Sequence, residues 1–193
     1  PTSAIYVELG LIYLAQGRDD LAKLVLGKSA ELDGKNPSVY NALALVAMGE
    51  GDDQLAFSYF DKAAELDPQY VDTRFNKAGV LLDAGDYEGA KVELDTITQI
   101  APDDMAAKVA LGVAYRGMGK HDIARTTWND VVKKAPRRGQ DRGDALFNIA
   151  ILEMDFVMDD KKAIAALDRY LDNAGDNHSK RKEAAELRKE LSN

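Results

Sequence analysis

Residues 40–68 read YNALALVAMGEGDDQLAFSYFDKAAELDP, and the main features of this stretch recur along the chain at a constant spacing. Its turn glycine, its helix alanine and its closing proline each belong to a series with a step of 34 residues. The members are Gly17, Gly51, Gly85 and Gly119; Ala22, Ala56, Ala90 and Ala124; and Pro68, Pro102 and Pro136. Three series that share one period predict an array of helix–turn–helix repeats.

Each of these positions has a local physical reason. Glycine adopts the left-handed conformation that ends a helix, so the glycine series predicts where the first helix of each repeat stops. Asp52 and Asp86 directly follow two of these glycines and are expected to cap the next helix through their carboxylates. Small residues such as Gly10 and Gly112 in the first helices predict a close approach of the paired helices. Proline then closes each repeat because it disfavours helical conformation in the residue before it.

The repeat resembles the tetratricopeptide repeat (TPR) family, whose pattern joins aromatic, Leu, small and Tyr positions to a later Gly, Ala, large apolar residue and Pro. Repeat two carries it at Tyr40, Leu43, Ala44, Gly51, Ala56, Phe60, Ala63 and Pro68, and repeat four at Leu111, Gly112, Tyr115, Gly119, Ala124, Trp128 and Pro136. The resemblance implies an all-α fold, a right-handed TPR α-solenoid. We expect about five repeats and a C-terminal capping helix in such an array.

We expect residues 1–193 to form a single TPR domain. The predicted repeats are 3–36, 37–70, 71–104, 105–138 and a degenerate unit at 143–174, followed by a capping helix at 179–192. Ser179 is the expected N-cap of that last helix, and Ala184, Leu187 and Leu191 form its one apolar stripe.

The charge is unevenly distributed. The net charge is −8, with 8 Lys+Arg against 19 Asp+Glu in residues 1–104 and 17 against 14 in residues 105–193. An acidic chain with this split is a poor general binder of nucleic acid, because phosphate contacts need concentrated Lys and Arg. The asymmetry favours orientation of a protein partner, and solvated helix faces are the alternative.

In TPR proteins the first helices line a concave groove, and the resemblance carries those positions onto this chain. The partner-binding residues expected in this groove are Val7, Leu11, Leu14, Asn41, Leu45, Met48, Phe75, Asn76, Leu82, Asp83, Val109, Val113, Arg116, Phe147, Asn148, Ile151 and Met154. The set is mainly apolar, which suits an amphipathic or hydrophobic segment of a partner protein. The asparagines are expected to hydrogen-bond the backbone of that segment. Internal packing of these residues within the chain is the alternative.

Three further places are expected to make secondary contacts. Repeat one has Ile5 and Ile12 where later repeats pack on a preceding unit, which suggests a removed N-terminal segment or self-association. Since the chain starts at Pro1 without Met, we expect a processed or excised fragment. The other two places are the basic run Arg137, Arg138 and Arg142, and the glycine-free apolar turn Phe156, Val157 and Met158. A solvated linker, an acidic partner and anionic lipid are the open interpretations of the basic run.

Nothing in the sequence indicates catalysis. The two histidines, His121 and His178, fall in a turn and a linker without metal-ligand spacing, and both are expected at the surface. There is no cysteine, so a thiolate nucleophile and a Cys-based metal site are excluded. We therefore expect no enzyme activity, no cofactor and no metal.

The sequence predicts a scaffold that binds a peptide or helix of a partner. Asn76, Gly79 and Leu82 give a weaker resemblance to bacterial TPR lipoproteins of type IV pilus assembly or gliding motility. This resemblance implies a cell-envelope protein whose lipid anchor lies outside these residues. A structural protein that self-assembles through repeat one is a third interpretation. No membrane-spanning segment is expected, and the sequence does not distinguish the cytoplasm from the periplasm.

Overall fold

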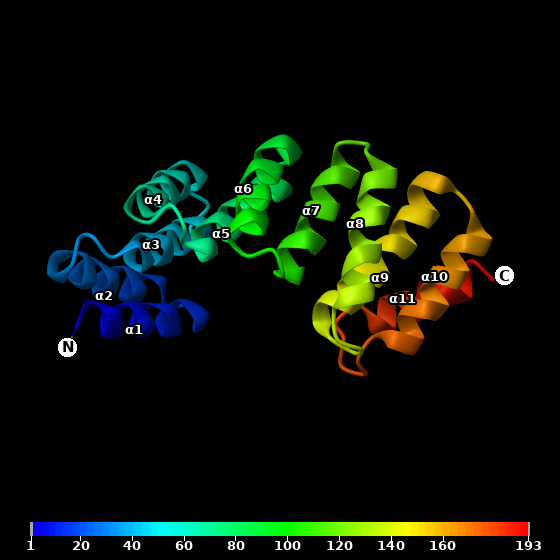
Figure 1. Cartoon of the computed structure of the whole chain (residues 1–193). Coiled ribbons are helices and arrows are strands. Elements are labelled where there is room, and N and C mark those ends of the chain that lie inside the picture. Colours follow the sequence, from blue (N-terminus) through cyan, green and yellow to red (C-terminus); the bar gives the residue numbers. More distant parts are fainter. Residues whose placement is uncertain (1, 193) are drawn as a thin grey trace. The chain divides into compact units, whose positions relative to one another are not determined.

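The computed structural model of the chain describes residues 2–192. These residues form eleven α-helices and one π-helical turn and contain no strand (Figure 1). They fold as two compact units, Pro1–Val80 and Leu81–Asn193, which we call unit 1 and unit 2. The all-α repeat fold is confirmed, and the assignment of residues 1–193 to a single domain stays a prediction.

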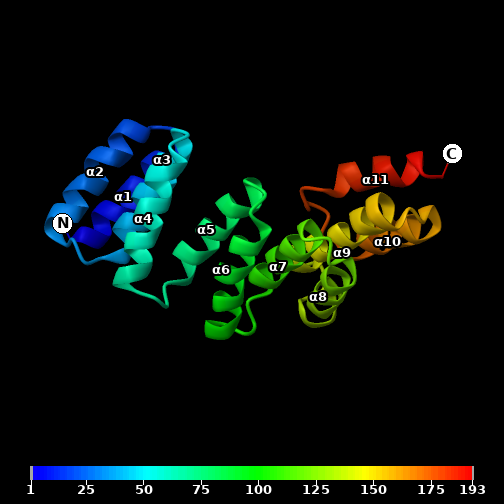
Figure 2. The same ribbon diagram turned by 90° about the horizontal axis from the view of Figure 1, so that it is seen from above.

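Unit 1 consists of two antiparallel helix pairs and the beginning of a further helix. In each pair the second helix packs along the first, and the two first helices, α1 and α3, also contact each other (Figure 2). The helices are α1 (Ser3–Ala15), α2 (Asp19–Leu32), α3 (Pro37–Gly49), α4 (Asp53–Leu66) and α5 (Val71–Asp83), the last of which continues past the end of the unit.

The turn glycines and the aspartate caps behave as the sequence predicts. The four glycines of the periodic series have φ between 67° and 77°, the left-handed region in which a Cβ is costly. The Asp52 carboxylate accepts the backbone N–H of Leu55 at 3.0 Å, and that of Asp86 accepts the N–H of Gly89 at 2.9 Å. At the turns of Gly51 and Gly85, local sequence therefore determines both where the first helix ends and where the second helix begins.

The core of unit 1 lies between its paired helices. Leu26 from α2 and Phe60 from α4 are fully buried, and each packs on the small residues of the first helix opposite. A Cβ placed on Gly10 would lie 2.6 Å from the Leu26 side chain, so a larger residue at this position would force the pair apart.

Unit 2 continues the same pairing as far as a degenerate last pair. Its helices are α6 (Tyr87–Ile100), α7 (Met105–Gly117), α8 (His121–Lys134), α9 (Gln140–Leu152), α10 (Asp160–Asn173) and α11 (Arg181–Glu190). A π-helical turn, η1 (Glu153–Val157), follows α9 directly and replaces the glycine turn. The first helices α7 and α9 contact each other, as α1 and α3 do in unit 1.

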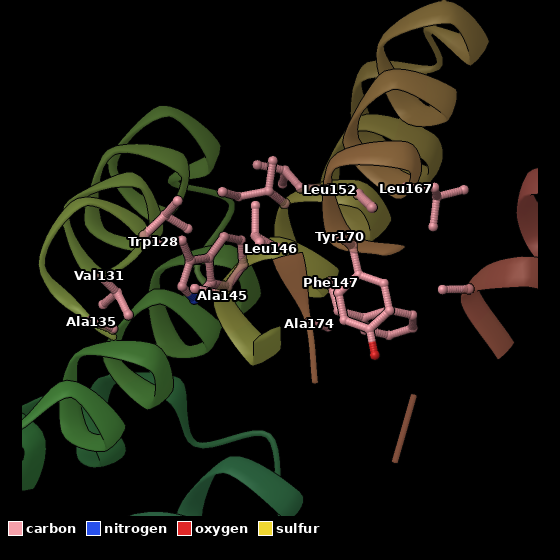
Figure 3. Close-up of a cluster of buried hydrophobic side chains, with 14 of the residues drawn as sticks. Trp128, Val131, Ala135, Ala145, Leu146, Phe147, Leu152, Leu167, Tyr170 and Ala174 are labelled. Carbon is pink, nitrogen blue, oxygen red and sulfur yellow. The ribbon is translucent and has the colours of Figure 1, made fainter. Parts of the chain in front are cut away.

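Trp128 is the largest fully buried side chain of unit 2. Its indole Nε1 donates to the Val109 carbonyl at 2.9 Å, and a Cβ on Gly112 would collide with the indole ring. Figure 3 shows Trp128 facing Ala145 and Leu146 of α9, within the same buried cluster that contains Leu167 and Tyr170 of α10.

The C-terminal helix covers this cluster, but it does not begin as predicted. Ala184 is fully buried, and Leu187 and Leu191 pack against the cluster, so the predicted apolar stripe is confirmed. The Ser179 N-cap is wrong. Ser179 lies in a turn before the helix, the residue at the cap is Lys180 without a side-chain cap bond, and the Arg181 N–H donates to the His178 carbonyl at 3.0 Å.

Candidate protein-binding surfaces

The first-helix face of unit 1 carries half-buried apolar side chains on two neighbouring helices. Leu11 and Leu14 of α1 pack against one buried cluster, and Leu45 and Met48 of α3 pack against the next. Each side chain is anchored on one side and partly open on the other. Such a surface offers apolar contact area without a large loss of side-chain freedom on binding.

A small polar network joins α3 to α5 on this face. The Asn41 Oδ1 accepts two hydrogen bonds, one from the Thr73 hydroxyl at 3.2 Å and one from the Asn76 amide at 3.0 Å. Asn41 is only 7% exposed. Its carbonyl oxygen is therefore used within the chain, which differs from the predicted bond to a partner's backbone.

The first-helix face of unit 2 contains an unusual cation. Arg116 of α7 is half-buried, and burial lowers the pKa of its guanidinium below the ordinary arginine value. Its Nη1 donates to Asn148 Oδ1 at 3.4 Å, and its guanidinium carbon lies 5.8 Å from the Trp128 ring centroid. Within residues 2–192, no carboxylate lies within ion-pair distance of Arg116.

Asn148 is fixed by α9 itself. Its Nδ2 donates to the Asp144 carbonyl at 2.9 Å, which leaves its oxygen turned to Arg116. The remaining predicted residues of this face surround the pair. Val109, Val113 and Ile151 pack partly against the unit 2 core, and Met154 is half-buried in η1.

Three predicted groove residues are buried. Val7, Asn41 and Phe147 are 5%, 7% and 7% exposed, so they have little surface to offer a ligand. Their burial favours the internal-packing alternative at these positions, because each helix turns them toward its neighbours. Of the α5 positions, Phe75 and Leu82 are half-buried. A groove that continues through all repeats stays a prediction.

One arginine of the basic run, Arg142, bonds to backbone carbonyls within the chain. The Arg142 Nη1 donates to the Val132 carbonyl and, at 3.4 Å, to the Ala135 carbonyl, so its guanidinium satisfies carbonyls at the end of α8. Arg142 is therefore used within the chain, and its role as a secondary contact stays a prediction. Arg137 and Arg138 are exposed, and Arg138 has a left-handed φ of 62°.

The apolar turn of the degenerate repeat is exposed. Phe156 is 48% exposed and its ring centroid lies 4.6 Å from that of His121, while Met158 is 82% exposed. Met158 has a left-handed φ of 53°, where the regular turns use glycine. Val157, the last residue of η1, is half-buried.

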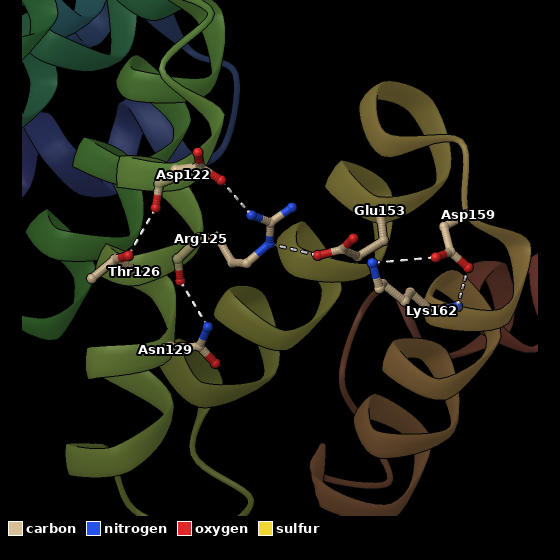
Figure 4. Close-up of polar contacts among 7 residues, drawn as sticks. All are labelled: Asp122, Arg125, Thr126, Asn129, Glu153, Asp159 and Lys162. Carbon is tan, nitrogen blue, oxygen red and sulfur yellow. Dashed lines mark hydrogen bonds and ion pairs between the residues drawn. The ribbon is translucent and has the colours of Figure 1, made fainter.

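An ion pair between Arg125 of α8 and Glu153 lies at the start of η1 (Figure 4). The Arg125 Nε lies 2.6 Å from the Glu153 carboxylate, whose side chain is 8% exposed, and the Arg125 Nη1 lies 2.7 Å from Asp122. Because this pair is partly desolvated, breaking it would leave a buried carboxylate unpaired. The turn is therefore held in place although it lacks a glycine.

Ile5 and Ile12 are exposed on α1, at 57% and 51%. Their exposure agrees with the expectation that repeat one lacks a packing partner on this side. Whether a partner covers them stays a prediction.

His178 is the largest departure from the expected surface positions. It is 7% exposed, and its Nδ1 lies 2.7 Å from the Tyr170 hydroxyl while its Nε2 lies 3.3 Å from Asp144 Oδ1. Gly143 of α9 makes room for the ring, since a Cβ there would lie 2.3 Å from it. Burial raises the pKa of Tyr170 to about 12. The expectation of a surface histidine is therefore wrong, because this ring joins α9, α10 and the start of α11.

A surface that the sequence did not indicate lies between the second helices of unit 1. This α2–α4 groove has a volume of about 530 Å³ and α3 as its floor. It is lined by Lys23, Gly27, Ala30, Tyr40, Leu43, Ala47, Leu55, Tyr59 and Lys62. The one sequence feature that indicates this groove is Gly27, a glycine in the middle of a helix.

Unit 2 has a groove at the equivalent place, between α6 and α8 above α7. This α6–α8 groove has a volume of about 320 Å³. It is lined by Thr98, Lys108, Leu111, Ile123, Thr126, Thr127 and Asp130. The repeat period places Lys108, Thr127 and Asp130 where the first groove has Tyr40, Tyr59 and Lys62.

Two features are absent from residues 2–192. No group of three or more His, Cys, Asp or Glu side chains is arranged to hold a metal ion. No helix in this part of the chain has the length and apolar character needed to cross a membrane.

An array of antiparallel helix pairs with glycine turns at a fixed period defines a helical-repeat protein. Family profiles described as tetratricopeptide repeat match residues 47–108 and 81–146, and another with the same description matches residues 7–71. The chain belongs to the tetratricopeptide repeat family. Its fold is that of a protein–protein interaction scaffold, and proteins of this family are in general non-catalytic.

Solved structures share this fold. Pseudomonas aeruginosa PilF is 22% identical with a TM-score of 0.78, and the match covers 98% of this chain and 88% of PilF. Yeast Tom70 is 20% identical with a TM-score of 0.78, over 99% of this chain and 40% of Tom70. YrrB, described as a TPR protein with an unusual peptide-binding site, is 20% identical with a TM-score of 0.70, over 95% and 90%.

In sequence, the chain is similar to anaphase-promoting complex subunit 3 of Schizosaccharomyces pombe. The two are 32% identical over 116 residues, which cover 60% of this chain and 17% of that protein. The chain thus spans a small part of this relative's length.

Proposed function

We propose that the chain is a non-catalytic scaffold whose first-helix faces bind an apolar segment of a partner protein, with a carboxylate of that segment at Arg116. The observation that carries this proposal is the Arg116 guanidinium, half-buried and without an ion pair in the described residues. A cation in this setting gains from a charge-assisted hydrogen bond to a carboxylate, which is stronger than a bond between neutral groups.

The surrounding side chains suit an apolar segment. Val113 and Ile151 flank the Arg116–Asn148 pair on adjacent helices, and both remain partly open. An amphipathic helix or an extended strand can place apolar side chains on such a face and a carboxylate at its edge. In unit 1, Leu45 and Met48 offer a similar apolar face without an arginine.

The test is a selection of random 16-residue peptides displayed on phage against the immobilised full chain. We expect the selected peptides to combine aliphatic or aromatic residues with Asp or Glu. Arg116→Met should weaken a selected synthetic peptide about tenfold, as expected for a lost charged hydrogen bond of about 1.4 kcal/mol. Arg169→Met, at an exposed arginine of α10, is the matched control. Selected peptides without acidic residues, or equal binding by both variants, would contradict the proposal.

A second candidate is a cell-envelope lipoprotein that assists assembly of a surface machine. It is favoured by the likeness to PilF, which covers nearly the whole of both chains. Sequencing and mass spectrometry of the natural N-terminus decide this point. A lipid-modified cysteine supports it, and an unmodified cytosolic start contradicts it.

Self-assembly is the third candidate, favoured by the exposure of Ile5 and Ile12. Light scattering over a range of protein concentrations should then show a rising mass for the wild type and a constant monomer mass for Ile5→Lys/Ile12→Lys. A concentration-independent monomer in the wild type would rule it out.

A further inference from the structure

We propose that the α2–α4 groove of unit 1 is a second binding site, which takes a peptide segment of a partner protein carrying an aromatic side chain next to a carboxylate. The site lies between α2 and α4, with Tyr40, Leu43 and Ala47 of α3 as its floor, and uses none of the residues assigned to the first-helix faces. The two proposals can therefore be tested separately, and failure of one does not exclude the other.

The groove is open because α2 has a glycine in its middle. A Cβ placed on Gly27 would have no atom within 4 Å, so packing does not require a glycine there. A glycine inside a helix is unfavourable relative to alanine, because it loses more backbone freedom on folding. Its effect on this structure is to leave the wall of the groove without a side chain, beside the small residue Ala30.

Two tyrosine rings line the groove, Tyr40 on its floor and Tyr59 on its α4 wall. The ring centroids of Tyr40 and Tyr59 are 6.4 Å apart, with 32° between the ring planes. The Tyr40 hydroxyl donates to the Gly34 carbonyl at 3.0 Å, which fixes that ring on the floor. Leu55 is 36% exposed at the rim. Aromatic rings separated in this way can contact a third ring by its edge or face.

A single uncompensated cation lies at the mouth of the groove. The Lys62 ammonium is 4.0 Å from the Tyr40 ring centroid, and no ion pair joins it to a carboxylate in the described part of the chain. The other lysine, Lys23, is neutralised by Glu50 at 2.5 Å, and this contact raises the pKa of Lys23. A carboxylate beside the bound ring would therefore find its partner in Lys62, which makes the charge of the site complementary to an acidic segment.

The volume agrees with this occupant. About 530 Å³ lies within the range of ligand sites and accommodates an aromatic side chain with its flanking backbone. The α6–α8 groove is smaller and has Asp130 in place of Lys62. Because it lies at the equivalent place in the repeat, the α6–α8 groove is the internal control for binding to the α2–α4 groove.

The test uses three N-acetylated, C-amidated tetrapeptides as probes: Gly-Phe-Asp-Gly, Gly-Phe-Lys-Gly and Gly-Ala-Asp-Gly. They are titrated into the isotope-labelled full chain, and amide chemical shifts are followed by NMR. We expect the first peptide to shift Leu43, Ala47 and Leu55 saturably, and the lysine and alanine peptides to bind at least about fivefold more weakly. The residues of the α6–α8 groove should not shift.

Two variants complete the test. Gly27→Leu fills the groove and should abolish the shifts, while Lys62→Gln should weaken the aspartate peptide about threefold and remove its advantage over the lysine peptide. Absence of localised shifts, equal binding of the aspartate and lysine peptides, or unchanged binding to a folded Gly27→Leu protein would each overturn the proposal. If Gly27→Leu does not fold, Lys62→Gln and the peptide comparison still decide it.

Discussion

The α2–α4 groove and the α6–α8 groove lie at the same place in the repeat and differ in the size and charge of several side chains. Both have a first helix as the floor and two second helices as the walls. One groove presents Tyr59 and Lys62, and the other presents Thr127 and Asp130 at the same repeat positions. Asp95, which pairs with Lys91, stands where the first groove has Gly27.

The difference shows how a repeat protein separates fold from binding. The buried positions keep one chemistry from repeat to repeat, since Phe60 and Trp128 fill equivalent places beneath the two grooves. The exposed positions change size and charge without disturbing the pairing of helices. Binding specificity in such a chain therefore follows from the departures from the repeat pattern.

The largest effect on stability is expected from truncation of the buried aromatic residues beneath the two grooves. Phe60→Ala and Trp128→Ala each remove a fully buried side chain, so each should cost about 3–5 kcal/mol of unfolding free energy in the affected unit. Urea unfolding followed by circular dichroism measures this cost. Costs that differ by more than about 2 kcal/mol would contradict the view that the two floors are equivalent.

The next largest effect on stability is expected at alkaline pH, at Tyr170 of unit 2. The folded pKa of Tyr170 is about 12, whereas an unfolded tyrosine titrates near 10. Above pH 10 the unfolded chain loses this proton first, so stability should fall by up to about 1.4 kcal/mol per pH unit between pH 10 and 12.

Tyr170→Phe should remove this part of the alkaline destabilisation, although it also loses the hydroxyl contact to His178. The measurement is the urea midpoint of both proteins at pH 8, 10, 11 and 12. Parallel pH profiles for the wild type and the variant would show that Tyr170 does not titrate in this way.

The smallest effect on stability is expected from substitutions at equivalent positions of α2 and α6. Gly27→Ala should stabilise the protein by about 0.5–1 kcal/mol, because its Cβ meets open space and improves the helix. Asp95→Ala on α6 should change stability by less than about 0.5 kcal/mol, since it exchanges a partly exposed i,i+4 ion pair for helix propensity. Destabilisation by Gly27→Ala in thermal unfolding would show that the glycine is needed for the fold.

The sequence predicted the features that depend on neighbouring residues. The left-handed glycines and the Asp52 and Asp86 caps are set within one turn of chain, so a periodic pattern determines them. Short-range rules are sufficient for these residues.

Features that depend on residues distant in sequence were missed. His178 is buried because Gly143 leaves space for its ring and Tyr170 bonds it, and neither contact is visible in the local sequence. Arg142 satisfies carbonyls ten and seven residues before it, which a charge run does not reveal. The α2–α4 groove likewise depends on residues from three helices. Among these residues only Gly27 is unusual within a helix.

The most direct test of the account exchanges the exposed chemistry of the two grooves. One protein carries Tyr59→Thr and Lys62→Asp in unit 1 together with Asp95→Gly, Thr127→Tyr and Asp130→Lys in unit 2. It is titrated with the Gly-Phe-Asp-Gly peptide by NMR. We expect the shifts to move from Leu43 and Leu55 to Leu111 and Ile123. Shifts that stay in unit 1 of the folded variant, or that appear in neither groove, would contradict it.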